Sequence, residues 1–164
     1  MLKHVLVPLD GSQLAEEALN HALSILEPTG RLTLISAVEV PDVPVYGYYP
    51  PVTIPDYETT KNDLLPYAKH YLEGIADKLM KQGYTVVTEA TLGDPADVIV
   101  KLAEKHQVEA IVMSTHGRSG INRWLFGSVT NKVLNAKPCP VYVIPSREPK
   151  TKETKEQGKV PAGA

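Results

Sequence analysis

MLKHVLVPLDGS, residues 1–12, is an apolar run that ends in a polar turn. Its β-branched residues favour a buried strand over residues 1–9, and the Asp-Gly-Ser sequence that follows favours a turn. Ser12 is well placed to cap a helix, because apolar residues then recur at three- and four-residue steps as far as Leu26, and a Pro-Thr-Gly sequence at residues 28–30 ends the pattern. The chain therefore opens with a buried strand, a turn and an amphipathic helix.

The same alternation of apolar strands and amphipathic helices continues along the chain. The strands are apolar on both faces, which is typical of a parallel sheet covered by helices. We therefore predict an α/β fold, a doubly wound five-stranded parallel sheet with helices on both faces. The further strands are expected at residues 32–40, 84–92, 108–113 and 140–145. The further helices are expected at residues 63–82, with Pro66 in the first turn, at residues 95–106, with Asp94 as a candidate cap before them, and at residues 128–136.

The overall composition limits the classes of partner. Lysine and arginine total 17 against 19 acidic residues, so the net charge of −2 gives no general attraction to nucleic acid or to an anionic membrane. The sequence has no apolar stretch long enough to span a bilayer, and its apolar start is too short for a signal peptide, which predicts a cytoplasmic protein. Residues 1–145 should form one domain, whereas residues 146–164 carry too few apolar groups to fold and should be a disordered tail.

Two long segments interrupt the regular pattern. Residues 41–57 carry five prolines and four tyrosines, which argues against a helix or a central strand. Their tyrosines could cover a ligand, contact a partner or pack over the sheet edge. The second segment, residues 114–127, is fourteen residues long, whereas strand-to-helix connections in this class usually have about two to six. Its length indicates a functional loop.

The second loop and the first turn are expected to lie at one edge of the sheet. Asp10 and Ser114 both follow strand ends, and Val38 reaches the same edge from the second strand. Ligands of open α/β sheets bind beyond the carboxyl ends of the strands. If the two strands are neighbours, the first turn and the loop form two walls of one cleft. The helix that starts at Ser128 would point its free N–H groups into this cleft, and Gly127 would let a phosphate approach the backbone. An anion site is therefore expected.

Other residues of the loop and helix would add to this site. The hydroxyls of Ser128 and Thr130 are possible donors, Gly117 permits a second close approach, and Arg118 would add a cation above the phosphates. The sequence lacks both the GxxxxGK[ST] and the GxGxxG phosphate motifs, so neither a Walker-type site nor a dinucleotide fold is supported.

The spacing of these glycines resembles the ATP-binding motif of the universal stress protein family. In that motif a glycine, two residues, a second glycine and nine further residues precede a Gly-Ser or Gly-Thr pair. Here the second glycine is Gly117 and the pair is Gly127 and Ser128, whereas Ser114 stands in the place of the first glycine. The opening VLVPLDGS, the Gly-Asp-Pro turn at residues 93–95 and the closing PCPVYVIP are also similar to that family.

This resemblance covers about residues 1–145 and implies an adenine nucleotide alpha hydrolase-like fold that binds ATP with Mg²⁺. It also implies a homodimer that pairs the strand Val141–Ile144 with its counterpart across a twofold axis. Carried over position by position, the family's contacts would be adenine with Pro8, Leu9, Val38 and Met113, ribose with Asp10, and phosphates with Gly117, Gly127, Ser128, Val129 and Thr130.

Three functions follow from these patterns: an ATP-binding regulatory switch of the stress response, a slow ATPase or nucleotidyl-transfer enzyme, and a dimeric interaction module without nucleotide. The replacement at Ser114 keeps the third one open. Asp10 has no second acid, base or nucleophile at a readable distance, so no catalytic residue is assigned. The histidines lack metal-ligand spacing, so no metal site is assigned either. His116 is expected to be a solvated loop histidine. Residues 124–126 could form an aromatic shelf for a base, but we expect them to pin the loop to the core.

Overall fold

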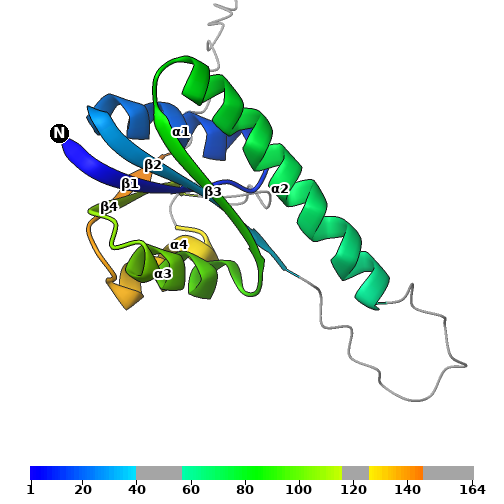
Figure 1. Cartoon of the computed structure of the whole chain (residues 1–164). Helices are drawn as coiled ribbons and strands as arrows, with labels where there is room; N and C mark the ends of the chain where they lie inside the picture. Colours follow the sequence, from blue (N-terminus) through cyan, green and yellow to red (C-terminus); the bar gives the residue numbers. More distant parts are fainter. Residues whose placement is uncertain (40–56, 116–125, 146–164) are drawn as a thin grey trace, which may run out of the picture.

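Strands and helices alternate throughout the part of the chain that the structure describes. A computed structural model of the protein describes residues 1–39, 57–115 and 126–145. All of the predicted strands and helices are present. The elements, drawn in Figure 1, are β1 (Leu2–Pro8), α1 (Gln13–Ile25), β2 (Leu26–Val38), α2 (Tyr57–Lys81), β3 (Thr85–Leu92), α3 (Pro95–Lys105), β4 (Ala110–Ser114), α4 (Ser128–Ala136) and β5 (Val141–Ile144).

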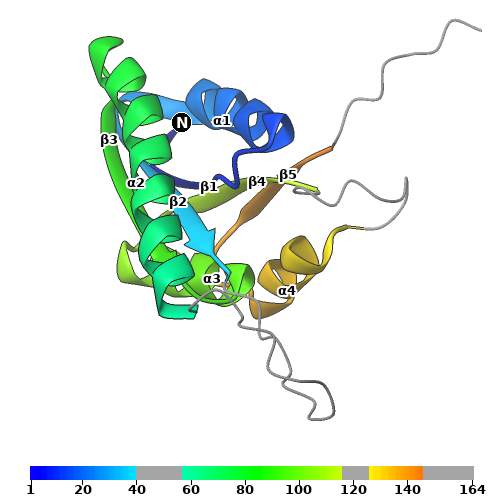
Figure 2. The same cartoon turned by 90° about the vertical axis from the view of Figure 1, so that its right-hand side faces the viewer.

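The strands form one parallel sheet in the order β3-β2-β1-β4-β5. Figure 2 shows α1 and α2 on one side of this sheet and α3 and α4 on the other. The order confirms the predicted doubly wound, five-stranded parallel sheet with helices on both faces. The chain adds strands on one side of β1 as far as β3 and then crosses to the other side of β1.

The strands are buried because their alternate side chains enter two separate cores. Val5 and Val7 of β1 pack with α1 and α2, whereas Leu6 between them packs with α3 and α4. Each of these three side chains is 0% exposed. A strand that is covered on both faces has to be apolar at successive positions, and for this reason near-continuous apolar runs predicted the fold.

Two helix starts were predicted from their capping residues and are confirmed. Ser12 Oγ accepts a hydrogen bond from the Ala15 N–H at 3.2 Å. Asp94 Oδ1 accepts hydrogen bonds from the N–H groups of Ala96 at 2.9 Å and Asp97 at 3.3 Å, and a proline occupies the first helical position. In both helices a side-chain oxygen satisfies N–H groups that have no partner within the helix.

The second strand begins earlier than its sequence predicts. The Pro-Thr-Gly sequence at residues 28–30 predicts a break, but β2 starts at Leu26, directly after α1. In place of a break, the register between β1 and β2 shifts here. Leu2 pairs with Leu26, and His4 already pairs with Arg31. A Cβ on Gly30 would lie 2.8 Å from the Leu26 side chain, so this excursion requires a glycine.

The second helix also begins earlier than predicted. It starts at Tyr57 rather than at residue 63, so Pro66 lies inside the helix and not in its first turn. A proline in a helix interior removes one backbone hydrogen bond and costs about 3 kcal/mol or more. Leu72 and Leu79, further along α2, are buried against the sheet. This packing holds the later turns of α2, whereas the turns before Pro66 extend the helix against the local preference on which the prediction rested.

Several predictions concern residues outside the described ranges. They are the loop at residues 41–56, most of the functional loop at residues 116–125, and the disordered tail at residues 146–164. Within the described ranges, no helix combines the length and the apolarity that a membrane crossing requires.

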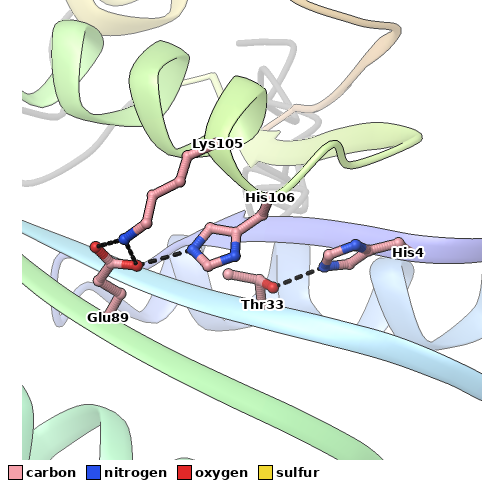
Figure 3. A network of polar contacts seen from close by, with 5 residues as sticks. All are labelled: His4, Thr33, Glu89, Lys105 and His106. Atoms are coloured by element: carbon pink, nitrogen blue, oxygen red, sulfur yellow. Dashed lines mark hydrogen bonds and ion pairs between the residues drawn. The ribbon is translucent and has the colours of Figure 1, made fainter.

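A polar network lies between α3 and the sheet (Figure 3). Glu89 Oε2 lies 2.8 Å from His106 Nε2, and Lys105 Nζ donates to Glu89 Oε1 at 2.8 Å. Beside them, His4 Nε2 lies 2.8 Å from Thr33 Oγ1. The two imidazole rings have centroids 6.5 Å apart and meet edge to face. The network therefore places one imidazole beside a carboxylate and the other beside a neutral hydroxyl.

The two ends of this network differ in their charge balance. Burial alone would raise the pKa of Glu89, but hydrogen bonds from the neighbouring ammonium and imidazole outweigh burial and hold this pKa below its ordinary value. Burial lowers the pKa of His4, and the charges of Arg31 and His106 lower it further against the opposing effect of Glu109. The fold therefore disfavours the protonated form of His4.

The lowered pKa of His4 predicts that the protein loses stability in mild acid. Below the ordinary histidine pKa of 6.5, the unfolded chain binds a proton at His4 that the folded chain excludes. The free energy of unfolding should therefore fall as pH drops from this value towards the lower pKa of the folded state. Urea unfolding at about pH 7.5 and about pH 5.5 measures this loss. The variant His4→Gln keeps a polar group beside Thr33 and should lose less stability than the wild type; equal losses would assign the effect to other groups.

Candidate functional site

The sheet splits at the carboxyl ends of β1 and β4. Pairing between these two strands ends at Leu6 and Ile111. Beyond this point the Leu9 N–H donates to β2 at 2.8 Å, whereas the Thr115 N–H donates to β5 at 3.0 Å. The strand order reverses here, and ligands of open α/β sheets bind at such a point. The first turn and the second loop follow neighbouring strands, so the condition for a cleft between them is met.

One side of the split is the turn that follows β1. Asp10 Oδ1 accepts hydrogen bonds from the Ser12 N–H at 3.0 Å and from the Ser12 hydroxyl at 2.6 Å. Gly11 between them has a φ of 82°, a left-handed conformation that favours glycine. The carboxylate is therefore held in one orientation by its own turn, as in an Asx turn.

Tyr71 of α2 reaches the helix that follows this turn. Its hydroxyl donates a hydrogen bond to Glu16 Oε1 at 3.0 Å, in the first turn of α1. Burial is the main cause that raises the pKa of the phenol well above its ordinary range, and the charges of Glu16 and Asp10 act in the same direction. The hydroxyl therefore stays protonated, and it links α2 to the start of α1 beside the split in the sheet.

The other side of the split is the start of α4. Its N-cap residue, Gly127, makes no side-chain hydrogen bond, and the first turn contains no acidic residue. Gly127 has φ −57° and ψ 161°, a conformation that any residue can adopt. Backbone geometry therefore gives no reason for a glycine at this position, whereas the close approach of a ligand would.

The first turn of α4 is tied directly to the end of β4. The Gly127 N–H donates to Thr115 O at 2.8 Å. The Thr130 hydroxyl lies 3.1 Å from Ser114 O and 3.2 Å from Thr115 O, and it donates to these carbonyls. In addition, the Asn131 side chain donates to the backbone oxygen of the residue before Gly127 at 2.8 Å. These bonds place the helix start at the same edge of the sheet as Ser114.

The predicted adenine contacts lie in two environments. Pro8 and Val38 are half-buried at the carboxyl ends of β1 and β2. Leu9 and Met113 are only 2% and 4% exposed, and their side chains belong to opposite cores. A base beside Leu9 and Met113 would therefore contact mainly their backbone.

The predicted phosphate contacts at the start of α4 also differ in exposure. Ser128 is exposed, and Val129 is half-buried. Thr130 is 2% exposed, and its hydroxyl is used by the end of β4. Thr130 can therefore offer a phosphate its backbone N–H but not the hydroxyl proton that the sequence suggested. Ser114, which replaces the first motif glycine, is 9% exposed.

Other predictions about the loop fall outside the described residues. They concern Gly117 and Arg118 as phosphate contacts, and also the roles of His116 and of residues 124–125. Phe126 is described and is 47% exposed. Nearly half of this residue remains at the surface, and the pinning of the loop to the core by residues 124–126 stays a prediction.

Sequence reasoning missed two ties between helices. One is the bond from Tyr71 to Glu16, and the other is the ion pair of Lys132 with Asp94, whose atoms lie 2.7 Å apart. Asp94 was assigned only as a helix cap. The partners are separated by 55 and 38 residues along the chain, so only the order of strands in the sheet brings them together.

Comparison with known proteins gives a consistent result over most of the chain. A family model described as the universal stress protein family matches residues 1–145. Universal stress protein MJ0577 of Methanocaldococcus jannaschii is 31% identical over 154 residues, which cover 88% of this chain and 95% of that protein. The solved structure of MJ0577 matches with a TM-score of 0.76 and 29% identity, and the match covers 91% of this chain and 99% of that one.

Two more distant structures share the fold and contain nucleotides. A universal stress protein in complex with cAMP has a TM-score of 0.55 at 22% identity, with 87% of this chain and 96% of that chain covered. A universal stress protein family protein of Arabidopsis thaliana with AMP bound has a TM-score of 0.61 at 17% identity, with 88% and 92% covered. At these identities the likeness is one of fold.

Proposed function

The chain belongs to the universal stress protein family, and we propose that it is an ATP-binding member that acts as a nucleotide-dependent regulatory switch in the stress response. The observation that carries this proposal is the start of α4, where Gly127 provides no side-chain cap and the first turn contains no acidic residue. The described residues thereby leave the first N–H groups and the positive end of the helix dipole to an anion.

An adenine nucleotide would contact both sides of the split sheet. The relatives with AMP and with cAMP support this ligand class. Asp10 would meet the ribose, and the backbone N–H groups of Ser128, Val129 and Thr130 would meet the phosphates. Pro8 and Val38 are the half-buried apolar groups beside the base. Gly117 and Arg118 complete the proposed phosphate contacts.

A magnesium ion would enter this site together with the triphosphate. Among the described residues, no group of three or more His, Cys, Asp or Glu side chains could hold a metal ion. Magnesium is commonly bound through substrate phosphates, with water and few protein ligands. Within the described part of the proposed phosphate site, the exposed Ser128 hydroxyl would be available as an oxygen ligand of the magnesium ion.

Nucleotide binding would act as a switch by joining the two sides of the split. Pairing between β1 and β4 ends at Leu6 and Ile111, so the turn at Asp10 and the start of α4 belong to separate halves of the sheet edge. A ligand that contacts both halves favours the arrangement in which they lie at the right separation. The proposed readout is a change in the homodimer surface.

The proposed dimer forms through β5. This strand lies at one end of the sheet order, and Tyr142 is 45% exposed. An edge strand has backbone groups that can pair with another strand. Pairing of Val141–Ile144 with its counterpart across a twofold axis would cover them.

We expect the purified full-length chain to carry or bind an adenine nucleotide. Mass spectrometry of the heat-denatured protein would identify a copurified nucleotide, and calorimetric titration of nucleotide-free protein would compare ATP, AMP, cAMP and GTP. ATP should bind more tightly than AMP, because additional phosphates meet the helix start. GTP should bind more weakly than ATP, because the proposed site recognises adenine.

Each contrary result assigns a different function. Protein that retains no nucleotide and binds none in titration would be a dimeric interaction module. Turnover of ATP that is lost in Asp10→Ala would make the protein an enzyme. Equal affinity for ATP and AMP would contradict the placement of the phosphates at α4.

A further inference from the structure

The carboxylate of Asp94 ties together the two helices that cover one face of the sheet. Its Oδ1 atom accepts hydrogen bonds from the first N–H groups of α3, at 2.9 and 3.3 Å. Its Oδ2 atom accepts a hydrogen bond from Lys132 Nζ of α4 at 2.7 Å. Because both oxygens belong to one planar group, the carboxylate links the start of α3 directly to the side of α4.

Helix α4 is otherwise attached to the described part of the chain at its start, by hydrogen bonds to the end of β4, and along one apolar face. It is nine residues long, and its buried residues are Thr130 and Val133. Residues three apart share one face of a helix, and Val129, which packs against the same core, widens this face. Lys132 lies outside this face, since successive residues are about 100° apart. The pair with Asp94 therefore adds a contact outside the apolar face and resists rotation of α4 about its own axis.

The positive charge of Lys132 is already balanced by nearby carboxylates. The hydrogen bond to Asp94 is the largest cause that raises the pKa of Lys132, and the charges of Asp97 and Glu39 add to it. Lys132 in turn is the largest cause that lowers the pKa of Asp94. Both groups stay charged near neutral pH, and the ammonium is engaged by carboxylates rather than offered to a phosphate.

We propose that the Asp94–Lys132 ion pair positions α4 so that its first N–H groups point at the phosphates of the bound nucleotide. This proposal rests on the proposed function, because it assumes a phosphate at the start of α4. Asp94 and Lys132 are positioning residues: they act through α4 and do not contact the ligand.

The variant Lys132→Met tests the proposal, since it keeps a long aliphatic side chain and removes the ammonium. The pair is largely exposed, with side chains 58% and 34% accessible, so its effect should be moderate. We expect the Kd of ATP to rise about two- to fivefold. The Kd of adenosine, which has no phosphates, should not change. The matched control is Lys101→Met, an exposed lysine of α3.

A second variant separates positioning from simple charge repulsion. Lys132→Met leaves the Asp94 carboxylate unpaired, and this charge could itself repel a triphosphate. Asp94→Asn removes that charge and retains a good N-cap for α3. The double variant Asp94→Asn/Lys132→Met should bind ATP as weakly as Lys132→Met if the pair positions the helix. Recovery of wild-type affinity in the double variant would show repulsion and overturn the proposal.

Three other results would also overturn it, and they have different meanings. Equal weakening of ATP and adenosine, with a lower Tm, would show that the pair only stabilises the fold. Unchanged affinity in Lys132→Met, with normal ATP binding by the wild type, would refute the positioning role alone. Absence of ATP binding by the wild type would refute the proposed function and this inference together.

Discussion

Replacement of Gly127 by valine should abolish measurable ATP binding and leave the fold intact. The φ of −57° and ψ of 161° at this position suit a β-branched residue, so the backbone gains no strain. The added side chain would stand between the phosphates and the first N–H groups of α4. Loss of two hydrogen bonds to a charged group, at about 1.5 kcal/mol or more each, corresponds to a rise in Kd of about 100-fold or more.

Three measurements make this test specific. Circular dichroism and the Tm of Gly127→Val should match the wild type, while calorimetric titration shows no ATP binding. Gly74→Val is the matched control, because a Cβ at Gly74 of α2 would meet nothing within 4 Å. Gly127→Ala adds a smaller group and should give an intermediate affinity. Wild-type affinity in Gly127→Val would place the phosphates elsewhere.

The fold followed from local patterns because each strand carries its own evidence of burial. Val5, Leu6 and Val7 are apolar in succession, and each is 0% exposed because helices cover both faces of the sheet. The cap at Ser12 was equally readable, since it involves residues three positions apart. Such features need no knowledge of which strands become neighbours.

The errors arose where packing between distant segments decides the local structure. Pro66 lies inside α2, although a rule based on sequence places it in a first turn. The break expected at residues 28–30 became a bulge within β2, because the strand pairs with β1 from Leu26. In both places the element extends beyond the limit that its own residues suggest.

The candidate site was predictable in position but not in detail. Asp10 and Gly127 were placed at the same sheet edge from the order of elements alone. The bond of Thr130 to the end of β4 and the pairing of Lys132 with Asp94 depend on how α4 packs. From the sequence, the Thr130 hydroxyl is a possible donor to a ligand. Only the packed fold shows that it donates to carbonyls at the end of β4 instead.

Replacement of Thr130 by valine tests this reassignment, and we expect it to destabilise the protein by about 1–3 kcal/mol. Valine has the shape of threonine but no hydroxyl. Thr130 is 2% exposed, and its hydroxyl donates to Ser114 O and Thr115 O. The variant therefore leaves a buried carbonyl with one donor fewer. Urea unfolding should show a lower midpoint with an unchanged m value.

The conservative variant distinguishes a structural hydroxyl from one that binds phosphate. Thr130→Ser keeps the donor and should recover most of the lost stability. Ser128→Ala removes an exposed hydroxyl from the same helix start and should leave stability unchanged. A Thr130→Val protein that unfolds like the wild type but binds ATP more weakly would show that the Thr130 hydroxyl contacts the phosphates. Loss of stability in Thr130→Val, restored in Thr130→Ser, would instead show that this hydroxyl holds α4 against β4.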